Sequence, residues 1–94
     1  MNDDRQKITK KFTIINALGL HARAAAAFVK IANRFQSEIQ VMKDEAAVNG
    51  KSIMGVLMLA ASKGSQIDVT AKGEDATEAI DALGKLIEDK FGEE

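Results

Sequence analysis

An alanine-rich stretch that follows Gly19 constrains the fold most, because it strongly favours a helix and an alternating, strand-like segment leads into it. Alanine, repeated from Ala24 to Ala27, has the highest helix propensity of all residues, and glycine is typical of a turn between a strand and a helix. The sequence therefore predicts a helix that starts at His21 or Ala22. This places the only histidine of the chain over a helix N-terminus.

The surroundings of His21 favour an anion. The first backbone N–H groups of a helix have no intrahelical acceptor, and the helix dipole adds about half a positive charge there. Arg23 contributes a planar guanidinium that suits bidentate contact with phosphate oxygens. An imidazole is a nucleophile near neutral pH, so these residues allow covalent capture of a phosphoryl group on His21. Two simpler roles stay open: helix capping and metal binding, for which only carboxylates could complete a site.

Length and composition limit the class of protein. The 94 residues, 46% hydrophobic and 29% charged, suit a single domain, which we place at residues 10–94 behind a flexible extension at residues 1–9. The lack of cysteine fits a reducing cytoplasm, and we expect a soluble cytoplasmic protein, since we find no signal core and no apolar run of membrane-spanning length. A formal net charge of −1 argues against general nucleic-acid binding.

Two hydrophobic periodicities alternate along the chain. Alternating apolar and polar residues predict strands at residues 10–16, 38–43 and 65–71, and a short strand that ends at Val48. Helical spacing predicts a helix after His21, one from Ser52 to Gly64, and one that opens at Asp75, with Glu78 at capping-box spacing, and stops at Gly92. The order βαββαβα predicts an α+β fold, a two-layer open-faced β-sandwich with a four-stranded antiparallel sheet and three helices on one face.

The predicted second helix is unusually apolar. Ser52 is a favoured N-cap, and the segment from Ile53 to Ala61 contains nothing polar. So short a helix cannot bury all of this surface against one sheet, so part of it should face a partner, although an entirely buried segment is the alternative. We expect one set of side chains to point inward and another outward: Val56, Leu59 and Ala60 inward, and Ile53, Met54 and Leu57 outward.

Two motifs in combination resemble one known family. Gly19-Leu20-His21-Ala22-Arg23 and, further along, Asn49-Gly50-Lys51-Ser52-Ile53-Met54-Gly55-Val56 closely resemble the HPr family, the histidine-containing phosphocarriers of the bacterial phosphotransferase system. The resemblance extends from about Lys10 to the end of the chain. It implies a carrier rather than a free-standing catalyst, without a cofactor. His21 would accept a phosphoryl group from enzyme I on Nδ1 and pass it to enzyme IIA proteins.

The resemblance also implies roles for other residues. The guanidinium of Arg23 and the backbone amides of Ala22 and Arg23 would hold the phosphate. In many relatives a regulatory kinase phosphorylates the serine that matches Ser52. The implied docking surface for partner proteins consists of Ile53, Met54 and Leu57, with Lys30 and Lys51 at its rim, and ordinary solvated lysines are the alternative for the last two.

Several alternatives remain at this point. A nitrogen-branch carrier would carry the same motifs, and a non-covalent regulatory module would use His21 only as a structural cap, although regulatory relatives lack the histidine. Ala24 replaces a common proline and Leu18 a common small polar residue, so we expect altered rigidity and a missing contact to the phosphohistidine. We expect a monomer. We also expect the N-termini of the first two helices to lie on the same side, so that Ser52 shares a surface with His21.

Overall fold

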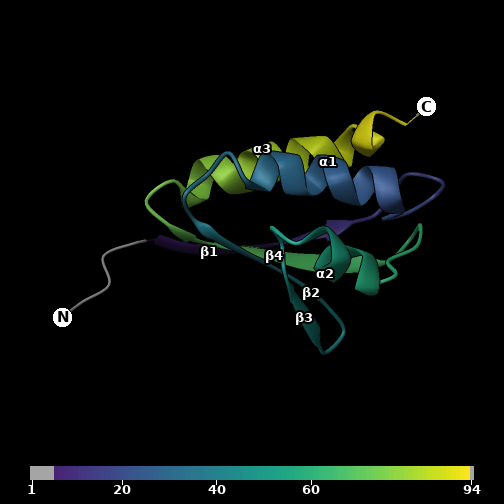
Figure 1. The fold of residues 1–94 in the computed structure, drawn as a ribbon, viewed down its shortest axis with the longest axis horizontal. Helices are drawn as coiled ribbons and strands as arrows, with labels where there is room; N and C mark the ends of the chain where they lie inside the picture. The colour runs from purple at the N-terminus through teal and green to yellow at the C-terminus, as the bar shows by residue number, and fades with distance from the viewer. Residues whose placement is uncertain (1–5, 94) are drawn as a thin grey trace.

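The computed structural model of the protein describes residues 6–93. Within this range the order βαββαβα is confirmed, followed by a 3₁₀ turn. Figure 1 shows the elements in chain order: β1 (Gln6–Thr13), α1 (Ala22–Ala32), β2 (Glu38–Lys43), β3 (Ala46–Asn49), α2 (Ile53–Met58), β4 (Gln66–Gly73), α3 (Ala76–Glu88) and the turn Lys90–Gly92. No helix in residues 6–93 is long and apolar enough to span a bilayer.

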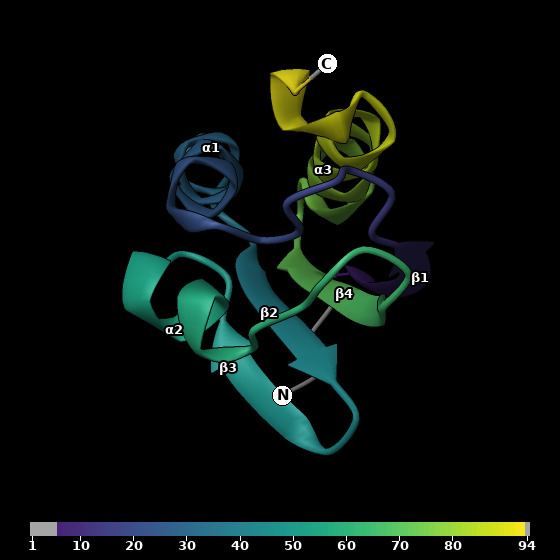
Figure 2. The same cartoon turned by 90° about the vertical axis from the view of Figure 1, so that its right-hand side faces the viewer.

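The described strands form one antiparallel sheet in the order β1-β4-β2-β3. The helices lie on one face of this sheet, and the view along the sheet in Figure 2 shows α1 and α3 side by side above it, with α2 beside β3. The predicted open-faced, two-layer α+β fold is therefore confirmed.

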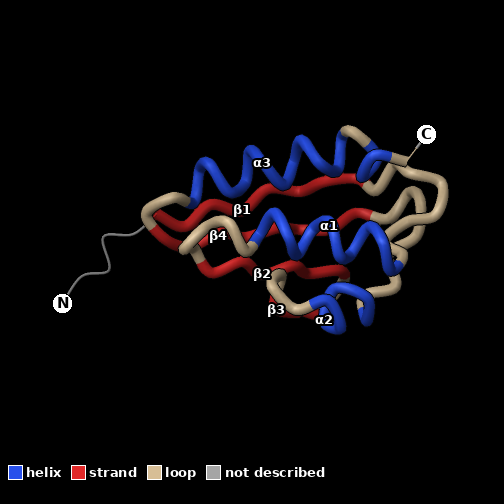
Figure 3. Tube along the Cα trace, turned by 45° about the horizontal axis from the view of Figure 1, so that its top comes forward, coloured by secondary structure: helices blue, strands red, loops and turns tan. Residues whose placement is uncertain are grey.

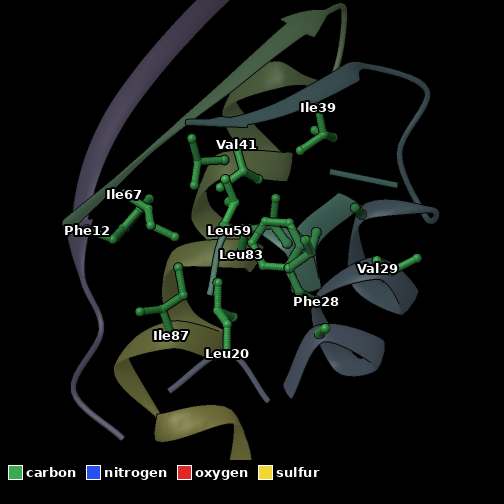
Figure 4. Close-up of a cluster of buried hydrophobic side chains, with 14 of the residues drawn as sticks. Phe12, Leu20, Phe28, Val29, Ile39, Val41, Leu59, Ile67, Leu83 and Ile87 are labelled. Atoms are coloured by element: carbon green, nitrogen blue, oxygen red, sulfur yellow. The ribbon is translucent and has the colours of Figure 1, made fainter. Parts of the chain in front are cut away.

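The core lies between the sheet and the helices. Alternate residues of β4 point inward, as predicted, with Ile67 and Val69 almost fully buried. Phe28 of α1 and Leu83 of α3 face them from the helical layer, and Figure 4 shows Ile67, Phe28 and Leu83 in one cluster of buried side chains. Burial of this apolar surface, at roughly 25 cal/mol per Å², holds α1 and the loop that precedes it against the sheet.

The first strand begins earlier than predicted. It starts at Gln6 rather than Lys10, because its partner β4 continues to Gly73 and pairs with it over the whole length, down to Gln6 opposite Gly73. Residues 6–9 of the predicted flexible extension are therefore part of the sheet, and the rest of that extension lies outside the described residues.

The second helix is shorter than predicted. It ends at Met58 instead of at Gly64, and Ala60 adopts a left-handed conformation with φ of 50°. Ala60 is exposed, so the prediction that it points inward was wrong, whereas the buried positions of Val56 and Leu59 are confirmed. The helix stops here because the backbone of Ala61 pairs with the loop before α1. The Ala61 carbonyl accepts a hydrogen bond from the backbone N–H of Leu20 at 2.8 Å.

The start of α3 also differs from the prediction. The Asp75 side chain caps no N–H of α3, so the predicted capping box is not formed. Its carboxylate instead accepts the backbone N–H groups of Gln36 and Ser37, both at 2.9 Å, and the Ser37 hydroxyl. The hydrogen bond from the Ser37 hydroxyl, followed by that from the Gln36 amide, lowers the pKa of Asp75 below its usual value of 3.8. Asp75 therefore joins the start of α3 to the loop between α1 and β2.

Helices α1 and α2 run in opposite directions, contrary to our expectation (Figures 1 and 3). The segment after α2 meets the start of α1 through the Leu20–Ala61 hydrogen bond. At the other end, the ammonium of Lys51, just before α2, donates to the carbonyl of Phe35, just beyond α1, at 2.7 Å. Their N-termini thus lie at opposite ends of the pair, and Ser52 lies far along α1 from His21.

Candidate functional site

A tight turn between β1 and α1, which contains Gly19, positions His21. Gly19 has φ of 67°, and a Cβ at this position would overlap the carbonyl oxygen of Ala61. The same carbonyl holds the next residue through the N–H of Leu20, whose side chain is buried in the core. Only glycine fits this combination of left-handed backbone and close approach. The turn therefore fixes where the following histidine stands.

His21 is the N-cap residue of α1, which begins at Ala22 as predicted. Its backbone is extended and its carbonyl accepts the N–H of Ala25 at 2.8 Å, but its side chain makes no capping hydrogen bond. The capping role left open for this imidazole is therefore not realised. The ring is partly exposed and available for chemistry.

His21 lines a surface hollow of about 540 Å³ together with Ala22 and Arg23. The structure thus brings together the residues that the sequence assigned to the phosphate site. The first backbone N–H groups of α1 and its dipole favour an anion here. The Arg23 guanidinium is exposed and forms no ion pair with any residue in the range 6–93, so it can bind an incoming anion without breaking an existing bridge. Within the same range, no cluster of three or more potential metal ligands occurs.

The other side of the hollow comes from the end of the chain, which the sequence analysis did not connect with the site. Phe91, Gly92 and Glu93 line it together with Leu18. Asn16, which is fully buried, donates from Nδ2 to the Glu93 carboxylate at 2.7 Å. One signal was available: Asn16 continues the inward-facing series of Phe12 and Ile14, and a polar side chain at such a position needs a hydrogen-bonding partner.

Large apolar side chains are also exposed on α2 and in the loop before α1. Ile53 and Met54 are 44% and 69% exposed, so their predicted outward orientation is confirmed, whereas Leu57 is half-buried and packs against the core. Two residues that the prediction did not include are also strongly exposed: Met58 at 76% and Leu18 at 68%. We call Leu18, Ile53, Met54, Leu57 and Met58 the apolar surface.

Ser52 and the two lysines lie at the far end of α1. Ser52 is the predicted N-cap of α2, since its Oγ accepts the N–H of Gly55 at 3.0 Å. Lys51 next to it is held by the Phe35 carbonyl, and Lys30 is an exposed residue in the last turn of α1. With a rise of about 1.5 Å per residue, Lys30 is roughly 13 Å from His21 along the helix. The structure does not bring these residues to the hollow.

Comparisons with known proteins agree on one family. Residues 8–89 match the PTS-HPr family model, described as "PTS HPr component phosphorylation site". The chain is 50% identical to the phosphocarrier protein HPr of Neisseria meningitidis serogroup A over 92% of this chain and 97% of that protein. It is 40% identical to the phosphocarrier protein NPr of Shewanella violacea over 93% and 96% of the two chains.

A solved structure gives the same result. The crystal structure of HPr-C-His from Thermoanaerobacter tengcongensis superimposes with a TM-score of 0.89 at 50% identity, over 93% of this chain and 98% of that one. The match therefore covers the fold, nearly the whole length and the segment around His21. The chain belongs to the PTS-HPr family.

Proposed function

We propose that this protein is a phosphocarrier that accepts a phosphoryl group from enzyme I on His21 and passes it to enzyme IIA proteins. The observation that carries the proposal is the position of His21 at the start of α1. Its imidazole makes no capping hydrogen bond to the helix and lines a hollow together with Arg23. The protein is a reactant in both transfers and not a free-standing catalyst. We propose that it acts in the cytoplasm as a monomer, because the same histidine must meet two partners in succession.

Each transfer forms one bond to phosphorus and breaks another. The lone pair of the His21 Nδ1 attacks the phosphorus of the group held by enzyme I, and the electron pair of the breaking bond stays on the donor atom of enzyme I. The transition state for phosphoryl transfer is stabilised chiefly by positioning and by electrostatics. The backbone amides of Ala22 and Arg23 and the Arg23 guanidinium supply positive charge to the phosphoryl oxygens. In the second transfer the roles are exchanged: His21 is the donor and the enzyme IIA protein is the acceptor.

Partner proteins are proposed to dock on the apolar surface. Exposed Met and Leu side chains suit a surface that must adapt to unrelated partners, because methionine is flexible and polarisable. Lys30 and Lys51 lie beyond the Ser52 end of this surface, and acidic partner surfaces would meet them there. The ammonium of Lys30, which has no ion-pair partner within residues 6–93, suits this role better than that of Lys51, which already donates to the Phe35 carbonyl.

We further propose that Ser52 is a regulatory phosphorylation site for an HPr kinase. Its hydroxyl is half-exposed at the start of α2, where a phosphate is favoured by the unpaired N–H groups.

A role in the sugar branch is our first choice over the nitrogen branch, since the identity to a protein named HPr exceeds that to one named NPr. A purely non-covalent regulatory role is less favoured, because it gives no function to the partly exposed imidazole of His21.

The experiment is covalent labelling. Incubation with enzyme I and phosphoenolpyruvate should add one phosphoryl group that is labile in acid, as a phosphoramidate is, and His21→Ala should abolish labelling. His21→Ala should keep the circular dichroism spectrum and melting temperature of the wild type, because the side chain makes no capping hydrogen bond. Undiminished labelling of this variant would end the assignment of His21.

A further inference from the structure

The end of the chain forms a hydrogen-bonded turn over the start of α1, which we call the C-terminal turn (residues 90–93). Lys90 and Phe91 both have left-handed backbones, with φ of 59° and 57°, which reverse the chain after α3. The N–H of Gly92 donates to Asp89 at 3.0 Å and that of Glu93 to Lys90 at 2.8 Å. Figures 1 and 2 show this turn beside the beginning of α1. The position of Glu93 is therefore set by the fold.

The side chain of Glu93 is tied to the loop that carries His21. Asn16 donates from the same Nδ2 to Glu93 Oε1 at 2.7 Å and to the Gly19 carbonyl at 2.8 Å, two positions before the histidine. Asn16 is fully buried, so it is a rigid support. Within residues 6–93 Glu93 has no cationic partner, although Arg23 lines the same hollow. A carboxylate is thus fixed beside the site without a neutralising ion pair to any residue in the range 6–93.

A phosphoryl group on His21 would enter a hollow that Glu93 lines. A phosphorylated side chain carries about −1.5 to −2 charges at neutral pH, and like charges repel more strongly in a partly enclosed site than in open water. The repulsion raises the free energy of the phosphorylated protein relative to the unphosphorylated one. We propose, on the basis of the proposed function, that Glu93, positioned by Asn16, sets the phosphoryl-transfer potential of His21 by destabilising the phosphohistidine.

The consequence is thermodynamic. Repulsion by Glu93 destabilises the phosphorylated carrier and so makes it a better donor of the phosphoryl group. Arg23 and the start of α1 stabilise the phosphorylated carrier and so make the unphosphorylated one a better acceptor. The two effects oppose each other in one hollow. Removing the Glu93 charge should therefore leave a protein that is phosphorylated readily but gives the group up less completely.

An exchange equilibrium between two carriers tests this directly. Wild type labelled with ¹⁵N and unlabelled Glu93→Gln are mixed with a trace of enzyme I and a limiting amount of phosphoenolpyruvate, and mass spectrometry measures the four species. Enzyme I lets the phosphoryl group move between the two carriers, so the final ratio depends on their transfer potentials and not on docking rates. The glutamine keeps an amide oxygen that can accept from Asn16, so the turn should stay in place. We expect the variant to hold the group about three- to tenfold more strongly, and less so at high salt.

Glu88→Gln is the matched control, because it removes the same charge from the last turn of α3, where the side chain lines a different hollow with Lys10 and Lys85. Its exchange constant with wild type should be close to one. An exchange constant of one for Glu93→Gln, or an equal shift for Glu88→Gln, would overturn the role of Glu93 while leaving the phosphocarrier function intact. A wild-type protein that enzyme I does not label at all would overturn both proposals.

Discussion

Arg23 is the cation that the start of α1 places at the hollow, so its geometry should matter as well as its charge. Arg23→Lys keeps the positive charge but loses the planar fork that can bind two phosphoryl oxygens. We expect transfer from enzyme I to slow about tenfold, since one charge-assisted hydrogen bond contributes about 1.5 kcal/mol, and we expect an unchanged melting temperature. Arg34→Lys, an exposed change just beyond the other end of α1, is the control for rapid-quench phosphotransfer measurements. Equal rates in Arg23→Lys and wild type would show that Arg23 is only a surface charge.

A separate prediction concerns Gly19, which lies in the turn that holds His21. Gly19→Ala is expected to destabilise the protein by about 2–4 kcal/mol, because a left-handed alanine is strained and its Cβ would overlap the Ala61 carbonyl. Gly64→Ala is a matched control: this glycine also has a positive φ, of 92°, but no atom lies near its virtual Cβ. Gly64→Ala should destabilise the protein only by the strain of a left-handed alanine backbone, about 1 kcal/mol. Urea unfolding would measure both, and equal losses would show that the close approach to Ala61 is unimportant.

At the scale of helices, the antiparallel arrangement of α1 and α2 changes what Ser52 can do. Ser52→Asp puts a negative charge at the start of α2, where it should be tolerated, so the melting temperature should stay the same or rise slightly. Because Ser52 lies far along α1 from the hollow, the charge should hardly affect the phosphohistidine itself. It should instead weaken binding of an acidic partner on the apolar surface, by about tenfold in apparent affinity for enzyme I.

Thr77→Asp is the control for this docking effect. Thr77 is an exposed residue in the first turn of α3, so the substitution adds the same charge to a helix start away from the apolar surface. Phosphotransfer kinetics over a range of carrier concentrations, and the hydrolysis rate of each phosphorylated variant, separate the two effects. An unchanged apparent affinity of Ser52→Asp for enzyme I, or a faster loss of its phosphoryl group, would contradict an effect through docking alone.

Single elements could be predicted from the sequence because their signals are local. The start of α1 follows from Gly19 and the alanines, and the Ser52 cap from a residue type favoured at that position. The misses depend on contacts between distant parts of the chain. Asp75 looks like the cap of its own helix but binds the backbone of Gln36 and Ser37. Periodicity carries no information on such pairings, or on the relative direction of α1 and α2.

The candidate site likewise contains residues that the sequence could identify and residues that it could not. His21, Ala22 and Arg23 are neighbours in the sequence and share the hollow, so a motif could identify them. Glu93 is 77 positions from Asn16, and only the packing of α3 against the sheet brings the two together. Residue types near one motif therefore predict the chemistry of a site, whereas the residues that adjust that chemistry can come from any part of the chain.

Stability of the whole molecule at low pH should depend on Asp75, which joins α3 to the loop between α1 and β2. Hydrogen bonds from the Ser37 hydroxyl and the Gln36 amide lower the pKa of this carboxyl in the folded state below 3.8, its usual value, which we take for the unfolded chain. The folded state therefore gains stability from the charged carboxylate above the unfolded-state pKa, and loses it as the pH falls through the lower, folded-state pKa. Asp75→Asn should melt at a lower temperature than wild type at neutral pH, and the difference should shrink below about pH 4.

Thermal unfolding followed by circular dichroism, from neutral pH down to about pH 2.5, measures this difference. Asp81→Asn is the matched control, since Asp81 is an exposed residue of the same helix, and it should not reproduce the narrowing gap at low pH. Ser37→Ala, which removes the donor with the largest effect on the pKa of Asp75, should follow Asp75→Asn in part. A gap between wild type and Asp75→Asn that stays constant over the whole pH range would mean that the bonds to Gln36 and Ser37 do not depend on the charge of Asp75.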